Sequence, residues 1–140
     1  MNISDSLLSA YQTTDYRIYA AKPYIMRIGI RFPEAIESLA KCAPDRGGLW
    51  ITAWKLGSKI TTNCENNRRL EIELKEHGLQ VSHSEGLARN SPYMERGFFA
   101  MTATRDQARW LCDKWQQDAV VFVGQSGIPE LLLNSELKLP

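Results

Sequence analysis

The sequence predicts an α+β fold, with a mixed, mostly antiparallel sheet and about four helices packed mainly on one face. The first reason is that segments with the helical spacing of apolar residues are interspersed among segments rich in β-branched and aromatic residues. The second is that several strand-like segments follow one another across turn residues and should pair as hairpins. Residues 1–140 contain no linker, repeat or low-complexity stretch, so a single domain is expected.

The N-terminal part of the sequence predicts a short helix followed by a hairpin. Residues 3–14 have helical spacing, and Ser4 stands where a helix N-cap is expected. Residues 16–20 and 24–30 carry β-branched and aromatic side chains in near alternation, and the AKP between them is suited to a turn. These two segments should form an antiparallel hairpin.

The next two segments predict a helix and a buried strand. Residues 31–48 have the pattern of a helix that Pro33 opens and that Pro44 and a Gly-Gly pair end. Residues 49–54, LWITAW, show no polar alternation beyond Thr52. This pattern is typical of a strand that is covered on both faces.

The stretch TTNCENNRRLEIEL predicts a helix with an unusually polar beginning. Thr62 and Glu65 have the spacing of a capping box, which starts a helix by bonding free backbone amides. Leu70 and Leu74 are four residues apart and should face the core. We therefore expect a helix over residues 63–77, with a polar stripe beside its apolar one.

A second hairpin is predicted after this helix. Residues 79–85 and 94–103 both alternate like strands, and the residues between them have loop composition. If the alternation is unbroken, Glu95 shares a face with Phe99 and Met101. A carboxylate on an apolar face is costly unless it is paired, so Glu95 is a residue of interest.

The C-terminal part predicts one more helix and two strands. Thr104 and Gln107 form a second capping-box pattern, which opens a helix over residues 105–117. Residues 119–124 should be a buried strand and residues 129–134 an edge strand, joined by turn residues.

Charge and hydropathy exclude several broad classes of protein. Seventeen Lys and Arg stand against sixteen Asp and Glu, a net charge of +1, and the arginines are scattered over several elements. Nucleic acid is therefore not an expected partner. No apolar run approaches the roughly 20 residues of a membrane span, and the first residues lack signal-peptide character. We expect a cytoplasmic protein without a membrane partner.

The sequence contains no motif for a metal or a cofactor. Cys42, Cys64 and Cys112 are widely spaced, with neither a CxxC pair nor an HExxH helix, and His77 and His83 are separated by a helix end and a strand. There is also no GxxxxGK[ST], GxGxxG or GxSxG pattern. We therefore expect no metal, no cofactor and no serine-hydrolase chemistry.

One candidate polar site emerges from residue types alone. Asn66 and Arg69 lie on one stripe of the polar helix, and Glu95 and Thr52 lie on strands. An amide, a guanidinium and a carboxylate together suit a polar or anionic ligand. The alternative is a structural network in which Arg69 neutralises an inward Glu95.

Five stretches, in this order, carry a resemblance to a known family: AYQTTDYRI, ITAWKLGS, ENNRRLEIEL, MERGFFAM and WQQDAVVFVG. They resemble the bacterial family catalogued as domain of unknown function 3293. The resemblance implies a small cytoplasmic bacterial protein and no established activity. The chain departs from the family pattern where Lys55 and Leu56 replace an Asn-Pro pair. The residues that match are Tyr11, Thr14, Tyr16, Thr52, Ala53, Ser58, Glu65, Asn66, Arg69, Glu95, Gln117 and Ala119.

Three hypotheses of function follow. The leading one is a non-enzymatic binding or interaction module, with an unknown protein or a small polar ligand as partner and the candidate site as its pocket. The second is a small hydrolase or transferase acting on a polar or anionic metabolite, with Glu95 as base and Arg69 holding the anion. The third is a protein inhibitor or immunity-type partner whose interface uses Trp54, Tyr93 or Arg89.

Overall fold

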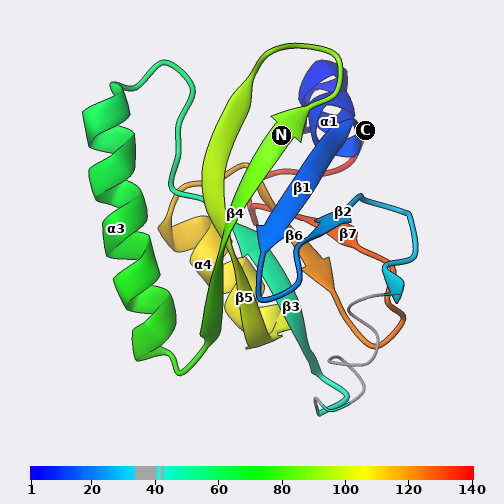
Figure 1. Cartoon of the computed structure of the whole chain (residues 1–140). Coiled ribbons are helices and arrows are strands. Elements are labelled where there is room, and N and C mark those ends of the chain that lie inside the picture. Colours follow the sequence, from blue (N-terminus) through cyan, green and yellow to red (C-terminus); the bar gives the residue numbers. More distant parts are fainter. Residues whose placement is uncertain (34–40, 42) are drawn as a thin grey trace.

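The computed structural model describes residues 1–33, 41 and 43–140, and seven strands in these ranges form one sheet (Figure 1). The strand order is β2-β1-β4-β5-β3-β6-β7, and the named strands pair antiparallel throughout. The strands are β1 (Thr14–Tyr19), β2 (Tyr24–Met26), β3 (Arg46–Ile51), β4 (Gln80–Ala88), β5 (Met94–Thr104), β6 (Ala119–Val123) and β7 (Glu130–Leu133). The helices are α1 (Asp5–Gln12), α3 (Ile60–Glu76) and α4 (Arg105–Lys114).

The centre of the sheet has the topology of a split βαβ fold. β3 and β4 flank β5 and run parallel to each other, with α3 as their crossover, and β5 and β6 flank β3 in the same way, with α4 as theirs. This β-α-β-β-α-β arrangement is the ferredoxin-like one. The β1–β2 hairpin extends the sheet beside β4, and β7 extends it beside β6. Both predicted hairpins are confirmed, as is β7 at an edge.

α3 and α4 cover one face of the sheet, as predicted (Figure 1). Leu70 and Leu74 of α3 and Leu111 of α4 are fully buried in a single apolar core with the strand residues Leu49 and Phe98. The inward positions predicted for Leu70 and Leu74 from the helical spacing are therefore correct. Burial of this kind, rather than helix propensity, holds such helices to a sheet.

The opposite face of the sheet curls around a second core. Tyr16, Trp50 and Phe99 are buried there together with the apolar side chains of β1, β2 and β6. The curl brings the chain after β2 to the turn before β7, where Gly29 N donates to Pro129 O at 2.9 Å. β3 lies between the two cores and is buried from Gly47 onward, as expected for a strand covered on both faces.

The helix count and several boundaries differ from the prediction. The strand predicted over residues 24–30 is described only over Tyr24–Met26, and the strand predicted over residues 49–54 runs over Arg46–Ile51. The described residues contain three helices rather than about four, and the helix predicted over residues 31–48 falls largely on residues 34–40 and 42, which lie outside them. Its predicted end is wrong, because Gly47 and Gly48 belong to β3. A Cβ atom at either position would clash, with Val123 O or with the Phe99 ring. Close strand approach, not a helix stop, explains this Gly-Gly pair.

One of the two predicted capping boxes is present. In α4, Thr104 Oγ1 accepts from Gln107 N and Gln107 Oε1 accepts from Thr104 N, both at 3.0 Å. In α3 the box is wrong, since the helix begins at Ile60 and its N-cap makes no side-chain hydrogen bond. Asn63 N already donates to Lys59 O, which places the predicted cap residue inside the first turn. Within the described residues, no helix combines the length and apolar character needed to cross a bilayer.

Candidate functional site

Two asparagines of α3 are buried in the same stripe as its leucines. Asn63 and Asn67 precede Leu70 and Leu74 with spacings of four, three and four, so all four side chains face the sheet. Asn67 Oδ1 accepts from Ala53 N at 2.8 Å, and its Nδ2 donates to Arg96 O on β5 at 3.0 Å. Asn67 thereby joins the helix, the chain leaving β3 and β5.

The chain that leaves β3 is held by further hydrogen bonds of the same kind. Asn63 Oδ1 accepts from Lys55 N at 3.0 Å and its Nδ2 donates to Lys55 O at 3.1 Å. Thr52 Oγ1 donates to Arg96 O at 2.5 Å and accepts from Trp54 N at 2.9 Å. Residues 52–55 are therefore fixed by buried side chains, which explains most of the polarity at the start of α3.

The fixed segment forms one wall of a cavity of about 500 Å³, here called the Glu95 cavity. The cavity lies next to α1, at the end of the sheet that is uppermost in Figure 1. Walls come from α1, β1, β4 and β5, from the chain after β3 and from the chain between α4 and β6. The lining residues are Leu7, Ala10, Tyr11, Thr14, Tyr16, Trp54, Lys55, Leu56, Gly86, Ala88, Tyr93, Glu95, Gln116, Gln117 and Asp118.

Glu95 is one of the polar groups that line this cavity. Tyr93 Oη donates to Glu95 Oε2 at 2.9 Å. In the described part of the chain, Glu95 Oε1 has no hydrogen-bond partner. Every fully buried side-chain oxygen there has a partner, so Oε1 is not fully buried and is open at the cavity that Glu95 lines. Burial raises the pKa of Glu95 to about 7, although the hydrogen bond from Tyr93 acts in the opposite direction. The carboxyl group can therefore gain or lose a proton near neutral pH.

Aromatic side chains make up much of the remaining wall. Tyr11, Tyr16, Tyr93 and Trp54 all line the cavity. Tyr16 packs edge-on against the Trp50 ring, with 4.8 Å between ring centroids, and its hydroxyl donates to Tyr11 O at 3.3 Å. Burial raises the pKa of the three tyrosines, so their hydroxyls stay protonated. These contacts hold Tyr16, and with it part of the aromatic wall, in place.

The charges at the cavity are mainly negative. Asp118 adds a second carboxylate to that of Glu95. Lys55 supplies one ammonium group, which donates to Gln116 O at 2.9 Å. Among the described lining residues there is no arginine.

The four residues predicted as a site do not come together. Thr52 is buried and bonded to backbone, and Glu95 lies in the cavity. Asn66 is partly exposed on α3, while Arg69 is exposed on the side of α3 that faces Trp115. The predicted pairing of Arg69 with Glu95 is therefore wrong. Thr52, Asn66 and Arg69 do not line the cavity that contains Glu95. A ligand role for these three residues remains a prediction.

Sequence reasoning missed several residues that shape the site. Asn63 and Asn67 continue the stripe of Leu70 and Leu74, and that spacing was a usable signal. Tyr93, which bonds Glu95, is predicted from the sequence only as part of a protein interface. Tyr11 and Gln117 carried no local signal for this position, because the fold brings them to the cavity from distant parts of the chain.

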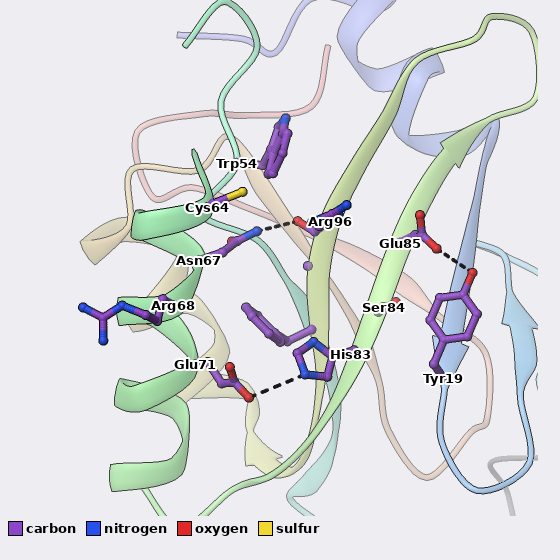
Figure 2. A pocket seen from close by; sticks show the side chains of 12 residues that line it. Tyr19, Trp54, Cys64, Asn67, Arg68, Glu71, His83, Ser84, Glu85 and Arg96 are labelled. Atoms are coloured by element: carbon purple, nitrogen blue, oxygen red, sulfur yellow. Dashed lines mark hydrogen bonds and ion pairs between the residues drawn. The ribbon is translucent and has the colours of Figure 1, made fainter. Parts of the chain in front are cut away.

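A second hollow, here called the groove, lies between α3 and the strands β4 and β5 and measures about 450 Å³ (Figure 2). Figure 2 shows Cys64, Asn67 and Glu71 projecting from α3 toward these strands, while Arg68 points away. Several of its charged groups have partners: Arg68 pairs with Glu65, and Glu71 Oε2 lies 3.8 Å from His83 Nε2.

The groove and the cavity have one described lining residue in common, and their other lining residues differ. Trp54 stands in the walls of both, and Tyr19 Oη donates to Glu85 in the groove at 2.6 Å. In the described ranges no three His, Cys, Asp or Glu side chains are gathered as metal ligands would be. The Glu95 cavity, with an open carboxylate oxygen, is the better candidate site.

Comparison with known proteins gives one family and no individual relative. The model of the family described as Protein of unknown function (DUF3293) matches residues 51–120. No curated protein and no solved structure was found to match the chain. The matched region runs from the end of β3 through α3, β4, β5 and α4 to the start of β6, and it includes Glu95. Since this region is half of the 140 residues, the chain belongs to the DUF3293 family.

Proposed function

We propose that the protein is a binding module that holds a small polar ligand in the Glu95 cavity. The observation that carries the proposal is the open Oε1 of Glu95 at the wall of a cavity of about 500 Å³. Ligand sites are typically concave, largely apolar and furnished with a few convergent polar groups. The aromatic wall and the single open carboxylate oxygen have this character. We also propose that the protein works in the cytoplasm, as expected from the sequence.

Two further features support a binding role. The wall is preorganised, because Asn63 and Asn67 fix the chain that carries Trp54, and less ordering is then needed when a ligand binds. Five residues of the family resemblance also line the cavity, although they come from separate parts of the chain. They are Tyr11, Thr14, Tyr16, Glu95 and Gln117.

A small enzyme is the second candidate, and one observation favours it. A carboxyl group with a pKa of about 7 is suited to act as a general acid or base at neutral pH. The anion-holding role foreseen for Arg69 has no support, since Arg69 lies outside the cavity. Turnover that the Glu95→Gln variant abolishes, with ligand affinity retained, would favour this candidate over a binding module.

An inhibitor or immunity-type partner receives less support from the fold. Tyr93 is bonded to Glu95, and Arg89 donates to the backbone of Gln12 and Thr13. Trp54 is partly buried between the two hollows. These side chains are engaged within the fold, and the interface they were expected to form stays a prediction.

The proposal is tested by thermal unfolding across a panel of metabolites. A ligand that binds only the folded state at about 100 times its Kd adds about 2.7 kcal/mol of stability. We expect at least one compound to raise the Tm of the wild type and of Glu85→Gln, but not of Glu95→Gln. Glu85→Gln is the matched control, because Glu85 also accepts a tyrosine hydroxyl but lies in the groove. A panel without any shift, or one whose shifts survive in Glu95→Gln, would contradict a ligand site at Glu95.

A further inference from the structure

The charges around the Glu95 cavity point to the sign of its ligand. Two carboxylates, Glu95 and Asp118, stand at the wall, and the single ammonium group, that of Lys55, is already bonded to Gln116 O. Among the described lining residues no guanidinium is present to hold a phosphate or carboxylate. An anionic ligand would meet like charges without a bidentate partner, which costs affinity.

The open oxygen of Glu95 calls for a hydrogen-bond donor on the ligand. Glu95 Oε1 is an open acceptor, whereas the hydroxyls of Tyr93, Tyr16 and Thr14 already donate to protein oxygens. Hydrogen bonds between a cationic donor and a carboxylate are about twice as strong as neutral ones. A protonated amine therefore satisfies the site better than a hydroxyl of the same size.

The aromatic wall favours the same ligand group. A cation placed over the face of a tryptophan or tyrosine ring is attracted by the electron-rich face, more strongly when water is excluded. Trp54, Tyr11, Tyr16 and Tyr93 supply such rings around the carboxylate. The same rings, together with small or apolar residues such as Ala10, Gly86 and Leu56, also suit an apolar ligand body.

We propose that the ligand of the Glu95 cavity carries a protonated amine on an apolar or aromatic body, with the amine donating to Glu95 Oε1. This inference rests on the proposed function and names its ligand class. It departs from the second hypothesis drawn from the sequence, in which Arg69 holds an anionic substrate. The change follows from the neighbours that the fold gives Glu95: tyrosines instead of an arginine.

Three probes of matched size test the ligand class: phenethylamine, phenethyl alcohol and phenylpropionate, titrated into the wild-type protein by calorimetry. We expect phenethylamine to bind at least about tenfold more tightly than either analogue, the ratio that one charge-assisted hydrogen bond provides. The preference should disappear in Glu95→Gln and persist in Glu85→Gln. Ranking the probes on the wild type alone keeps the test decisive even if Glu95→Gln folds poorly.

Several results would overturn the ligand class. Equal or tighter binding of the alcohol or the carboxylate would do so, as would an amine preference that survives in Glu95→Gln, or no binding of phenethylamine at millimolar concentration. If metabolites in the thermal panel still shift the wild type through Glu95, the binding module stands and only the amine falls. If no metabolite shifts it and no probe binds, both proposals fail.

Discussion

The two hollows of this protein each contain a glutamate that accepts a hydrogen bond from a tyrosine. In the groove, Tyr19 donates to Glu85, and in the cavity Tyr93 donates to Glu95. The two glutamates lie on neighbouring strands and differ in what stands across from them. Glu85 is flanked by Arg17 on β1 and by an arginine on β5, whereas Glu95 faces Gly86.

The difference teaches that the surroundings, not the pair itself, decide what a carboxylate can do. Exposed arginines stand opposite Glu85 on both neighbouring strands, where opposite charges stabilise a cross-strand pair. The residue across from Glu95 on β4 is Gly86 rather than an arginine, and burial raises the pKa of Glu95 to about 7. The tyrosines differ in the same way, since the pKa of Tyr19 is raised chiefly by its hydrogen bond and that of Tyr93 chiefly by burial.

The largest expected effect that tests this contrast is on the pH dependence of stability. The pKa of Glu95 rises from an ordinary 4.5 to about 7 on folding, so the folded state binds more protons between these values. The free energy of unfolding therefore falls as pH rises through this window. Relative to Glu95→Gln, the wild type should lose about 3 kcal/mol between about pH 4 and about pH 8, measured by urea unfolding. If the wild type lost as much stability relative to Glu85→Gln as it does relative to Glu95→Gln, the two glutamates would not differ and the prediction would be contradicted.

The next effect concerns the chain after β3, residues 52–55, whose Trp54 lies in the walls of both hollows. Asn67→Ala removes the acceptor of the buried Ala53 N and should lower the free energy of unfolding by about 2 kcal/mol. Asn66→Ala, one residue away and partly exposed, is the matched control and should change it by less than about 0.5 kcal/mol. Urea unfolding measures both. Similar losses for the two variants would show that Asn67 does not hold the wall.

The smallest effect compares the two tyrosine hydroxyls. The hydrogen bond from Tyr93 lowers the pKa of Glu95, so Tyr93→Phe should raise that pKa further, at a cost of about 1 kcal/mol in stability. Tyr19→Phe should leave the titration of Glu95 unchanged, because its hydroxyl serves Glu85. Carbon-detected NMR of the Glu95 carboxyl measures both. A matching shift in Tyr19→Phe would mean that the two pairs are coupled.

Much of the fold was predictable because its elements have clear local patterns. The alternation of β5 correctly placed Glu95 on the face of Phe99, and Thr104 with Gln107 correctly marked the start of α4. The Gly-Gly pair misled because the same residues stop a helix or allow close strand packing, and the neighbouring strands decide between these outcomes.

The candidate site was less predictable, for two physical reasons. Polar side chains are mostly exposed, so Asn66 and Arg69 were preferred although Asn67 continues the stripe of Leu70. The second reason is topology. Tyr11 and Glu95 line the same cavity because β1 pairs with β4. The local periodicity of a sequence does not predict the order of strands in a sheet.

The short helix α1 gives the cavity an unequal tolerance to mutation. The sheet and α3 fix Glu95, and changes there disturb buried hydrogen bonds. α1 contains no fully buried residue, yet its Leu7, Ala10 and partly buried Tyr11 contribute to the cavity wall. Under the proposed function, substitutions in this helix should therefore alter ligand preference at little cost in stability. α1 is thus a segment through which selection, or a protein engineer, can change ligand specificity while the carboxylate stays in place.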